Sequence, residues 1–446
     1  MTRQFDCFVF TRITISDSVV DFMKKYSKLF VRLRFIDCKI FSQKRKSPYR
    51  ERFLKCDNLK YLETENSDVI ALFAFIPNVT TLMVHECSSL TDYAMCQLNK
   101  TLYKLEMLSL SGSIIYNEAD YEKFYVNGKT IETNPSKSVL SFAAVKKFIE
   151  NHKKTITGLN LSKLKLPPET VVTISNINGL KLKNVSFSPD LPSSVIKKFC
   201  ANQFSLTSLQ LTSLCHVTDE TVSALCKFLP NLENLFIYPN RKIDESIVEI
   251  FQLEHLEVLF LGNSKAISEL NYGQAVLKLK AFKLKDLNLV SAQITDYSLY
   301  ELLKRNLNIR HLNISHTSVS NETLNMISKN LINLESLNLD ACTRISDPGI
   351  TGEFQYFSNS LTPTPLSNLK NLRKLNISNN ELITSNGCIK ALKFPYLRSL
   401  RLQECPFFTY RHDIHRILEE QNPRLAHFMI SGNSIKYMKI GYFQGS

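Results

Sequence analysis

A short hydrophobic pattern, L-x-x-L-x-L, recurs along most of the chain. In the second half its starts are roughly 24–28 residues apart, with one longer gap of about 38 after Leu334. Alternation with period two predicts a short β-strand in each copy, with the second and third aliphatic side chains pointing to a core. The clear copies begin at Leu206, Leu232, Leu256, Leu284, Ile309, Leu334, Leu372 and Leu397, and weaker copies extend the series in both directions.

A polar stop and a helical period follow the strand pattern. Thr218 or Asp219 is well placed as an N-cap, and Val222 and Leu225 share one face of the helix that follows. The same Ser/Thr-Asp pair recurs at 16–17, 91–92, 295–296 and 346–347. The pattern therefore predicts a side-chain oxygen that accepts from a backbone N–H at each of these helix starts.

A strand and a helix repeated at this period cannot bury their apolar faces alone, so neighbouring units must stack. Strands pack about 4.8 Å apart while helices are about 10 Å across, so the stack must curve with its strands inside. We therefore predict an α/β solenoid, a curved horseshoe with a parallel sheet on the concave face and helices on the convex face. Residues 1–446 form one array of about sixteen units in this interpretation.

Two intervals break the rhythm and are predicted to be insertions, at 111–140 and 352–367. The first leaves a strand end, so it could fold over the rim of the concave face; a mobile loop or a degenerate repeat explains it equally well. The second follows a helix start and is expected to lie away from the sheet.

A compact residue stands three positions beyond the last aliphatic of the strand pattern. A residue that turns the chain inward beside its counterpart in the next unit must be small, and a buried thiol behaves as a small hydrophobe. The eleven cysteines never fall as C-x-x-C, so we interpret them as inert buried thiols rather than disulfide, redox or metal groups. The position holds Cys38, Cys87, Asn240, Ser264, Ala292, Thr317, Cys342, Asn380 and Cys405.

The stretch Leu334 to Asp347 carries L-x-x-L-x-L-x-x-C-x-x-I-S-D, and Leu206 to Asp219 repeats it with Leu in place of Cys. This motif resembles the cysteine-containing class of leucine-rich repeat, which is typical of F-box and leucine-rich-repeat proteins, the substrate receptors of SCF ubiquitin ligases. The resemblance implies a leucine-rich-repeat solenoid that binds a protein substrate on its concave face.

The chain departs from that family in one respect. No F-box pattern is visible, Trp is absent, and the repeats already begin near Phe5 without a polar capping unit. We therefore expect the sequence to be a fragment whose F-box, with its Skp adaptor and cullin partners, lies upstream. If the sequence is complete, a stand-alone interaction scaffold without ligase association is the alternative.

Composition is that of a folded protein, with 44% hydrophobic and 22% charged residues in 446. The sequence has no apolar run of about 18 residues and no signal-peptide pattern, which predicts a cytoplasmic or nuclear location and no membrane partner. The net charge is +14, and residues 1–55 alone carry fourteen Lys or Arg against five Asp or Glu. This segment suits an anionic partner or a solvated loop. Because its basic residues lack interleaved aromatic stacking positions and form no known nucleic-acid motif, nucleic-acid binding is the less favoured interpretation.

Catalytic and cofactor motifs are not evident. No glycine-rich phosphate loop, nucleophile elbow or zinc spacing occurs, and His412 and His415 lack neighbouring ligands at metal spacing. The sequence predicts a protein that is not an enzyme and that needs no cofactor or metal.

Strand residues that flank the buried aliphatics must face the concave surface. Phe236, Tyr238 and Phe260 stand out, because adjacent units place their aromatic rings side by side, as in an interface hot spot. Packing of the three rings against each other is the alternative. The candidate protein-binding residues are Phe236, Tyr238, Phe260, His311, Asn338, Asp340 and Arg401.

Overall fold

The computed structural model describes residues 6–40, 54–111, 134–162, 166–187, 191–211, 217–238, 243–262, 264–279, 283–353, 363–405, 413–430 and 437–438. The chain divides into two compact units, Met1–Thr212 and Ser213–Ser446. Each unit is described below by itself.

In the N-terminal unit, parallel strands pair in chain order, with one aliphatic rung in register across them: Leu33, Leu62, Leu82, Leu108, Leu159, Val185 and Leu209. The strands are β1 (Cys7–Thr11), β3 (Arg32–Ile36), β6 (Tyr61–Glu65), β8 (Thr81–His85), β9 (Met107–Leu110), β10 (Gly158–Asn160), β11 (Asn184–Phe187) and β12 (Ser208–Leu211). Two short parallel pairs lie outside this sheet, β2 (Thr14–Ile15) with β4 (Lys39–Ile40) and β5 (Leu54–Lys55) with β7 (Phe73–Phe75).

Helical segments connect these strands. They are α1 (Asp17–Lys25), η1 (Ser27–Leu29), η3 (Ile70–Leu72), α2 (Asp92–Asn99), α4 (Phe142–His152), α5 (Pro168–Ser175) and α6 (Ser193–Asn202). Their apolar sides are buried, as at Phe148 and Phe199.

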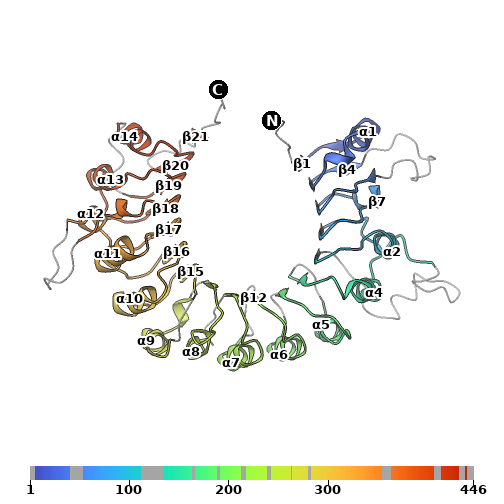
Figure 1. Ribbon diagram of the computed structural model, residues 1–446, viewed down its shortest axis with the longest axis horizontal. Coiled ribbons are helices and arrows are strands. Elements are labelled where there is room, and N and C mark those ends of the chain that lie inside the picture. Colours follow the sequence, from blue (N-terminus) through green and yellow to red (C-terminus); the bar gives the residue numbers. More distant parts are fainter. Residues whose placement is uncertain are drawn as a thin grey trace. The chain divides into compact units, whose positions relative to one another are not determined.

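The C-terminal unit repeats the arrangement. Its parallel strands are β13 (Asn234–Ile237), β14 (Val258–Leu261), β15 (Asp286–Asn288), β16 (His311–Asn313), β17 (Ser336–Asn338), β18 (Lys374–Asn376), β19 (Ser399–Leu402) and β20 (His427–Ile430), and β21 (Tyr437–Met438) runs antiparallel to β20. The helical segments are α7 (Asp219–Phe228), α8 (Ile247–Ile250), η4 (Ser264–Ala266), α9 (Glu269–Leu277), α10 (Asp296–Lys304), α11 (Asn321–Asn330), α12 (Asp347–Thr351), η5 (Leu366–Asn368), α13 (Ser385–Ala391) and α14 (Asp413–Gln421). Figure 1 shows the strands of each unit side by side, with the helices along the opposite face.

Between the two faces lies the core that the sequence predicts. Leu334, Leu337 and Leu339 are buried, and their equivalents in neighbouring units are buried with them. The compact position after the strand is also buried wherever its side chain is described, at Cys38, Cys87, Ala292, Thr317, Cys342, Asn380 and Cys405. The strand-then-helix unit and the small residue that follows the strand are therefore confirmed.

Two positions beyond the last core residue of the strand pattern, nine described residues have a left-handed backbone, although none of them is glycine. They are Arg12, Asp37, Asn66 and Glu86 in the N-terminal unit and Ser291, His316, Ala341, Asn379 and Glu404 in the C-terminal unit, with φ between 45° and 60°. In seven of these nine residues the N–H donates to a carbonyl of the next unit, as from His316 to Asp340 at 2.7 Å. The Glu86 N–H donates to the Ser111 hydroxyl of the next unit instead. The turn therefore adds one hydrogen bond to the parallel ladder while directing the chain into the core.

The predicted N-caps form at most helix starts but not at all. The hydroxyls of Thr91, Thr218 and Thr295 accept from a backbone N–H three residues on, as expected. The prediction was wrong at Ser16 and Ser346, where the hydroxyl makes no cap bond. Ser346 instead accepts from Asn321 Nδ2 of the preceding unit at 2.8 Å, which uses the hydroxyl between units.

A residue at or just before the start of each of these helices links one unit to the next. The carboxylate of Asp347 at the start of α12 accepts from the backbone N–H of Thr384, at the start of α13, at 2.8 Å. The same contact to the next helix start is made by Asp92, Asp219, Asp244, Glu269, Asp296 and Asn321. We call this series the carboxylate relay, since all but one of its members are acidic.

Both predicted insertions fall largely outside the described residues, at 112–133 and 354–362. The described end of the first pairs with the start of α2, where Tyr93 N–H donates to the Ser136 carbonyl. The described end of the second lies on the helix side, where Thr364 N–H donates to Asn325 of α11 at 2.6 Å. A single array, and its curvature over the whole chain, stay predictions.

Candidate protein-binding surface

The three aromatic residues singled out from the sequence lie together on the sheet face. Phe236 on β13 is in register with Phe260 on β14, and their ring centroids are 6.2 Å apart. Tyr238 packs against Phe260 with the centroids 5.1 Å apart, and 41% of its surface is exposed. The rings thus contact each other and still present apolar surface, so both alternatives describe part of the geometry. A partner-binding role for them stays a prediction.

Gly262 makes this aromatic cluster possible, and sequence reasoning missed it. A Cβ at this position would lie 2.5 Å from the Tyr238 ring and 2.7 Å from the Phe260 ring. Both distances are far below van der Waals contact, so any side chain would push the rings apart. The signal in the sequence is a glycine directly after a strand, where the other units carry a side chain.

A groove of about 390 Å³ extends from this cluster across the sheet face. Leu259, Leu287 and Leu312 are among its lining residues, although their side chains are buried in the core. Its other lining residues come from five consecutive strands: Phe236, Val258, Phe260, Asp286, Asn288, His311, Asn313, Ser336 and Asn338. Predicted residues on β13, β14, β16 and β17 therefore share one surface.

His311 is exposed and pairs with the neighbouring strand. Its Nδ1 lies 2.5 Å from Asp286 Oδ1, and the two residues are in register on β15 and β16. Asp286 was not among the predicted residues, because its proximity to His311 depends on strand register. The pair places a carboxylate that is hydrogen-bonded to an imidazole in the middle of the groove.

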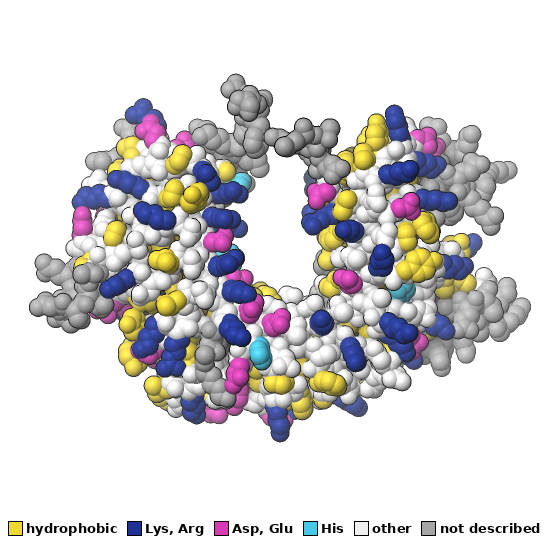
Figure 2. Space-filling view, viewed as in Figure 1, with side chains coloured by type: hydrophobic (Ala, Val, Ile, Leu, Met, Phe, Trp, Pro, Cys, Tyr) yellow, Lys and Arg dark blue, Asp and Glu magenta, His cyan; other side chains and the backbone are white. Residues whose placement is uncertain are grey.

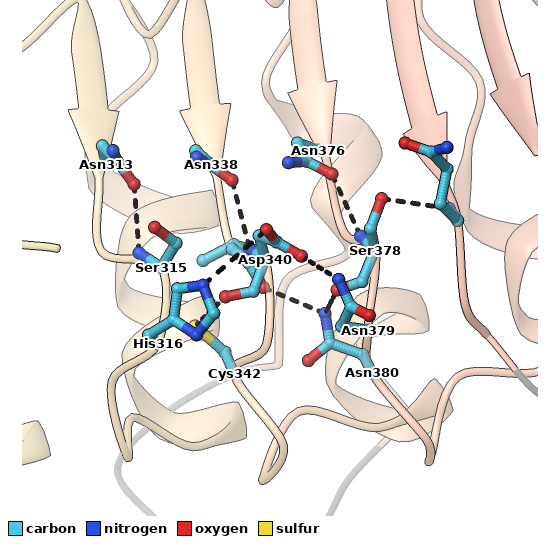
Figure 3. Close-up of polar contacts among 12 residues, drawn as sticks. Asn313, Ser315, His316, Asn338, Asp340, Cys342, Asn376, Ser378, Asn379 and Asn380 are labelled. Atoms are coloured by element: carbon cyan, nitrogen blue, oxygen red, sulfur yellow. Dashed lines mark hydrogen bonds and ion pairs between the residues drawn. The ribbon is translucent and has the colours of Figure 1, made fainter. Parts of the chain in front are cut away.

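Asn338 belongs to a row of asparagines that end successive strands. Each Oδ1 accepts from the backbone N–H two residues on: Asn288 from Val290, Asn313 from Ser315, Asn338 from Asp340, and Asn376 from Ser378, all at 3.1 Å. Figure 3 shows three of these side chains at their strand ends. Because the oxygen is used internally, Asn338 has its amide N–H₂ left to face a partner.

Asp340 lies two residues after the end of β17, among polar neighbours. Its carboxylate accepts from Asn379 Nδ2 at 2.7 Å, and its second oxygen is 4.0 Å from His316 Nε2 (Figure 3). Beneath it, Cys342 donates from Sγ to the Ile314 carbonyl of the preceding unit at 3.1 Å. Burial raises the pKa of Cys342 to about 11, which suits an inert thiol.

Arg401 on β19 is exposed and has basic neighbours. Its register partner is Asn376, and Lys374 is the register partner of Ser399, so both cations lie on the same face of adjacent strands. Arg373 and Arg398 precede these strands and are also exposed. We call Arg373, Lys374, Arg398 and Arg401 the basic cluster.

A second, more polar pocket of about 520 Å³ lies where the strands begin. Lys285, Arg310, Glu335 and Arg373 line it together with Asn308, Asn333 and Asn371. Glu335 lies 3.4 Å from Arg373 and 4.0 Å from Arg310, so one carboxylate partly compensates two guanidinium groups. The charged residues that line this pocket therefore carry a net positive charge.

The sheet face of the N-terminal unit carries its own hydrogen-bonded group. Arg34 donates two hydrogen bonds to Glu63, at 2.7 and 3.1 Å, and the Tyr61 hydroxyl donates to the same carboxylate at 2.6 Å. Burial and the bond to Glu63 raise the pKa of Tyr61 to about 12. Burial alone would raise the pKa of Glu63, but the bonds from Arg34 and Tyr61 outweigh it and lower that pKa.

The structure also locates the residues examined for metal binding. His415 packs against Phe428 with the rings tilted and their centroids 4.6 Å apart, while His412 lies outside the described residues. Within the described ranges, no three His, Cys, Asp or Glu side chains are grouped as metal ligands. A search of the same residues finds no helix with the length and apolarity to cross a bilayer.

Comparison with known proteins supports the repeat assignment locally. A family model described as Leucine Rich repeat matches residues 368–390, which contain β18 and the start of α13. No curated protein matches the chain.

Several solved structures are similar to it. The Rad7 and Elc1 complex in yeast matches at 17% identity and a TM-score of 0.48, over 96% of this chain and 82% of that chain. An internalin (inlF) from Listeria monocytogenes matches at 14% identity and 0.37, over 86% and 77%. A TLR13–ssRNA13 complex matches at 14% identity and 0.43, over 96% and 68%. The parallel strands, the alternating helices and the matched repeat together identify the fold as an α/β leucine-rich-repeat solenoid.

Proposed function

We propose that this chain is a non-catalytic protein-recognition subunit, and that it serves as substrate receptor of an SCF-type ubiquitin ligase in the cytoplasm or nucleus. The observation that carries the recognition role is the groove in the C-terminal unit, because a concave, partly apolar surface with a few placed polar groups is suited to a ligand. The ligase association rests on the resemblance of the repeat motif at Leu334–Asp347 to F-box and leucine-rich-repeat proteins.

Replacing Phe236, Tyr238 and Phe260 together by Ala tests the recognition role. We expect partner capture to fall at least ten-fold, because exposed aromatic anchors dominate interface energetics. Thermal unfolding should change little for a surface cluster, and circular dichroism checks this. Undiminished capture by a folded triple variant would show that the binding surface lies elsewhere.

Affinity purification of the tagged protein from its native cells tests the ligase association. Skp adaptor and cullin subunits should co-purify, and adding the upstream coding sequence, if one exists, should increase their yield. Reproducible partners without Skp or cullin would favour a stand-alone interaction scaffold instead.

A further inference from the structure

Charge changes systematically along the sheet face of the C-terminal unit. The face is apolar at β13 and β14, carries the Asp286–His311 pair at β15 and β16, and is basic at β18 and β19. Figure 2 shows Lys and Arg side chains along the sheet side of this unit, with acidic side chains among them. The two ends of the face therefore suit different chemical groups.

The basic end has more positive charge than its surroundings neutralise. Glu335 pairs with Arg373 at 3.4 Å. In the part of the chain that the structure describes, no carboxylate lies within 4.0 Å of the cationic groups of Lys374, Arg398 or Arg401. Exposed cations that lack a partner and are held on adjacent strands form a local positive field, which favours carboxylate groups.

The groove leads from the apolar end to this basic end. Its last lining residues, Ser336 and Asn338 on β17, are in register with Lys374 and Asn376 on β18. Asn376 is in turn in register with Arg401 on β19. A peptide that lies in the groove therefore reaches the basic cluster where the groove ends.

The distance between the apolar end and the basic end of the face sets the length of a peptide that can reach both. Strands β14 to β18 are consecutive neighbours, so at about 4.8 Å per strand the aromatic cluster and Lys374 are roughly 19 Å apart. An extended peptide rises about 3.3 Å per residue, so it covers this separation with about six residues.

We propose that this face binds a linear segment of a partner protein in which an aromatic or aliphatic anchor is separated by about six residues from a cluster of Asp or Glu. The anchor packs on Phe236, Tyr238 and Phe260, and the carboxylates pair with Lys374, Arg398 and Arg401. The inference rests on the proposed recognition function and names the class of substrate segment that the surface selects.

An acidic peptide fits the charge pattern better than a nucleic acid does. A polynucleotide carries a negative charge at every phosphate and needs cations along its whole path. Asp286 lies midway along this groove and would repel a phosphate there, and the groove lining at β13 and β14 contains no Lys or Arg. Positive charge at one end and apolar surface at the other match a segment whose two ends differ in chemistry.

Selection from a phage-displayed library of random 16-residue peptides tests the proposal on the full chain. Enriched sequences should carry paired Asp or Glu about five to eight residues from a Phe, Leu, Ile or Met. An enriched synthetic peptide should then bind Lys374→Glu/Arg401→Glu at least ten-fold more weakly than the unaltered protein. Selection on that variant should enrich Lys or Arg in place of the acidic residues.

A matched control is Lys227→Glu/Lys329→Glu, which makes the same change in net charge at exposed lysines of α7 and α11. Its affinity for the peptide should be unchanged. The proposal is overturned if no peptide is enriched, if enriched peptides lack the acidic group, if both variants weaken binding equally, or if a 20-nucleotide single-stranded oligonucleotide displaces the peptide more effectively than free acidic peptide does. Co-purification of Skp and substrates without acidic selection would leave the proposed function standing and reject only this inference.

Discussion

The compact residue after a strand contributes small volume and, in several units, a hydrogen bond between units. Cys38, Cys342 and Cys405 each donate from Sγ to a carbonyl of the preceding unit, and Asn380 makes the equivalent bond from its side-chain nitrogen to Leu339. Thr317 donates instead within its own unit, to the Ile314 carbonyl. A small side chain therefore satisfies the position, with or without a weak donor, and cysteine is one solution among several. This explains why the residue type varies while its size does not.

At this residue scale we predict that alkylation separates the thiols by burial. Iodoacetamide at pH 8 should modify the exposed Cys7 within minutes, because its thiolate can be reached. Cys342, buried and with its pKa raised to about 11, should react only in denaturant. Peptide mass spectrometry with and without 6 M guanidinium, about the usual unfolding concentration, measures both. Rapid labelling of Cys342 in the native protein would contradict an inert, structural thiol.

A second prediction concerns Gly262 at the aromatic cluster. Gly262→Ala should displace the Tyr238 and Phe260 rings, because the added methyl carbon would lie 2.5 Å from Tyr238. Partner capture should weaken several-fold while the unfolding temperature changes by only a few degrees. Gly273→Ala in α9 is the matched control, since its nearest neighbour would be at an ordinary 3.8 Å and alanine favours a helix. Equal capture by the two variants would indicate that the position of the rings does not matter for binding.

At the scale of elements, the carboxylate relay joins consecutive helices. Asp347 accepts from the Thr384 N–H at 2.8 Å and from its hydroxyl. A Cβ on Gly387 would lie 2.0 Å from the same carboxylate, so this glycine leaves room for the acid. The helix start, the acid of the preceding unit and the glycine therefore form one contact.

We predict that Asp347→Ala lowers the free energy of unfolding by about 1–3 kcal/mol, because it leaves backbone and hydroxyl donors without their acceptor. Gly387→Ala should also destabilise the protein through the clash with the carboxylate. In the Asp347→Ala background the cost of Gly387→Ala should shrink, since the colliding oxygens are gone. Urea unfolding of the two single variants and the double variant gives the coupling, and strictly additive losses would argue against the contact.

The sequence predicted these elements unequally. Alternating aliphatics at Leu334, Leu337 and Leu339 predicted both the strand and its buried side, because burial follows directly from local periodicity. The left-handed residue could not be predicted, since Arg12, His316 and Ala341 share no side-chain property and the turn is imposed by the ladder. The relay was half visible: the Ser/Thr-Asp pair was recognised, but the acceptor role of its acid involves an amide of the next unit.

The candidate surface was also predictable only in part. The alternation of side chains along a strand placed Phe236 and Phe260 on one face, because each strand fixes the orientation of its own side chains. Asp286, Lys374 and the groove became apparent only once strand register was known, since register depends on the loops between units.

At the scale of the whole molecule, repeat units contact mainly their neighbours, so local losses should stay local. The Glu63 pKa is lowered in the folded state, so its stabilising contribution is complete above the unfolded value of about 4.5 and is lost as the pH falls through the folded value. We predict that acidification from pH 7 to about 3 lowers the hydrogen-exchange protection of β3, β6 and β8, after correction for the intrinsic exchange rate, before it affects β15 to β18. Mass spectrometry of exchanged peptides measures this, and Glu63→Gln should remove the difference. Uniform loosening of both units would show that the Arg34–Glu63–Tyr61 group is not its source.

The carboxylate relay also gives the array a direction. Each acid serves the helix that follows it, and in the C-terminal unit this dependence runs from Asp219 through to Asp347 without interruption. Removing a unit from the C-terminal end deprives no remaining helix of its acceptor. Removing one from the other end leaves the next helix start with unsatisfied amides. Unravelling should thus be asymmetric: loss at the C-terminal end stays confined, whereas loss of an earlier unit undermines the start of its successor.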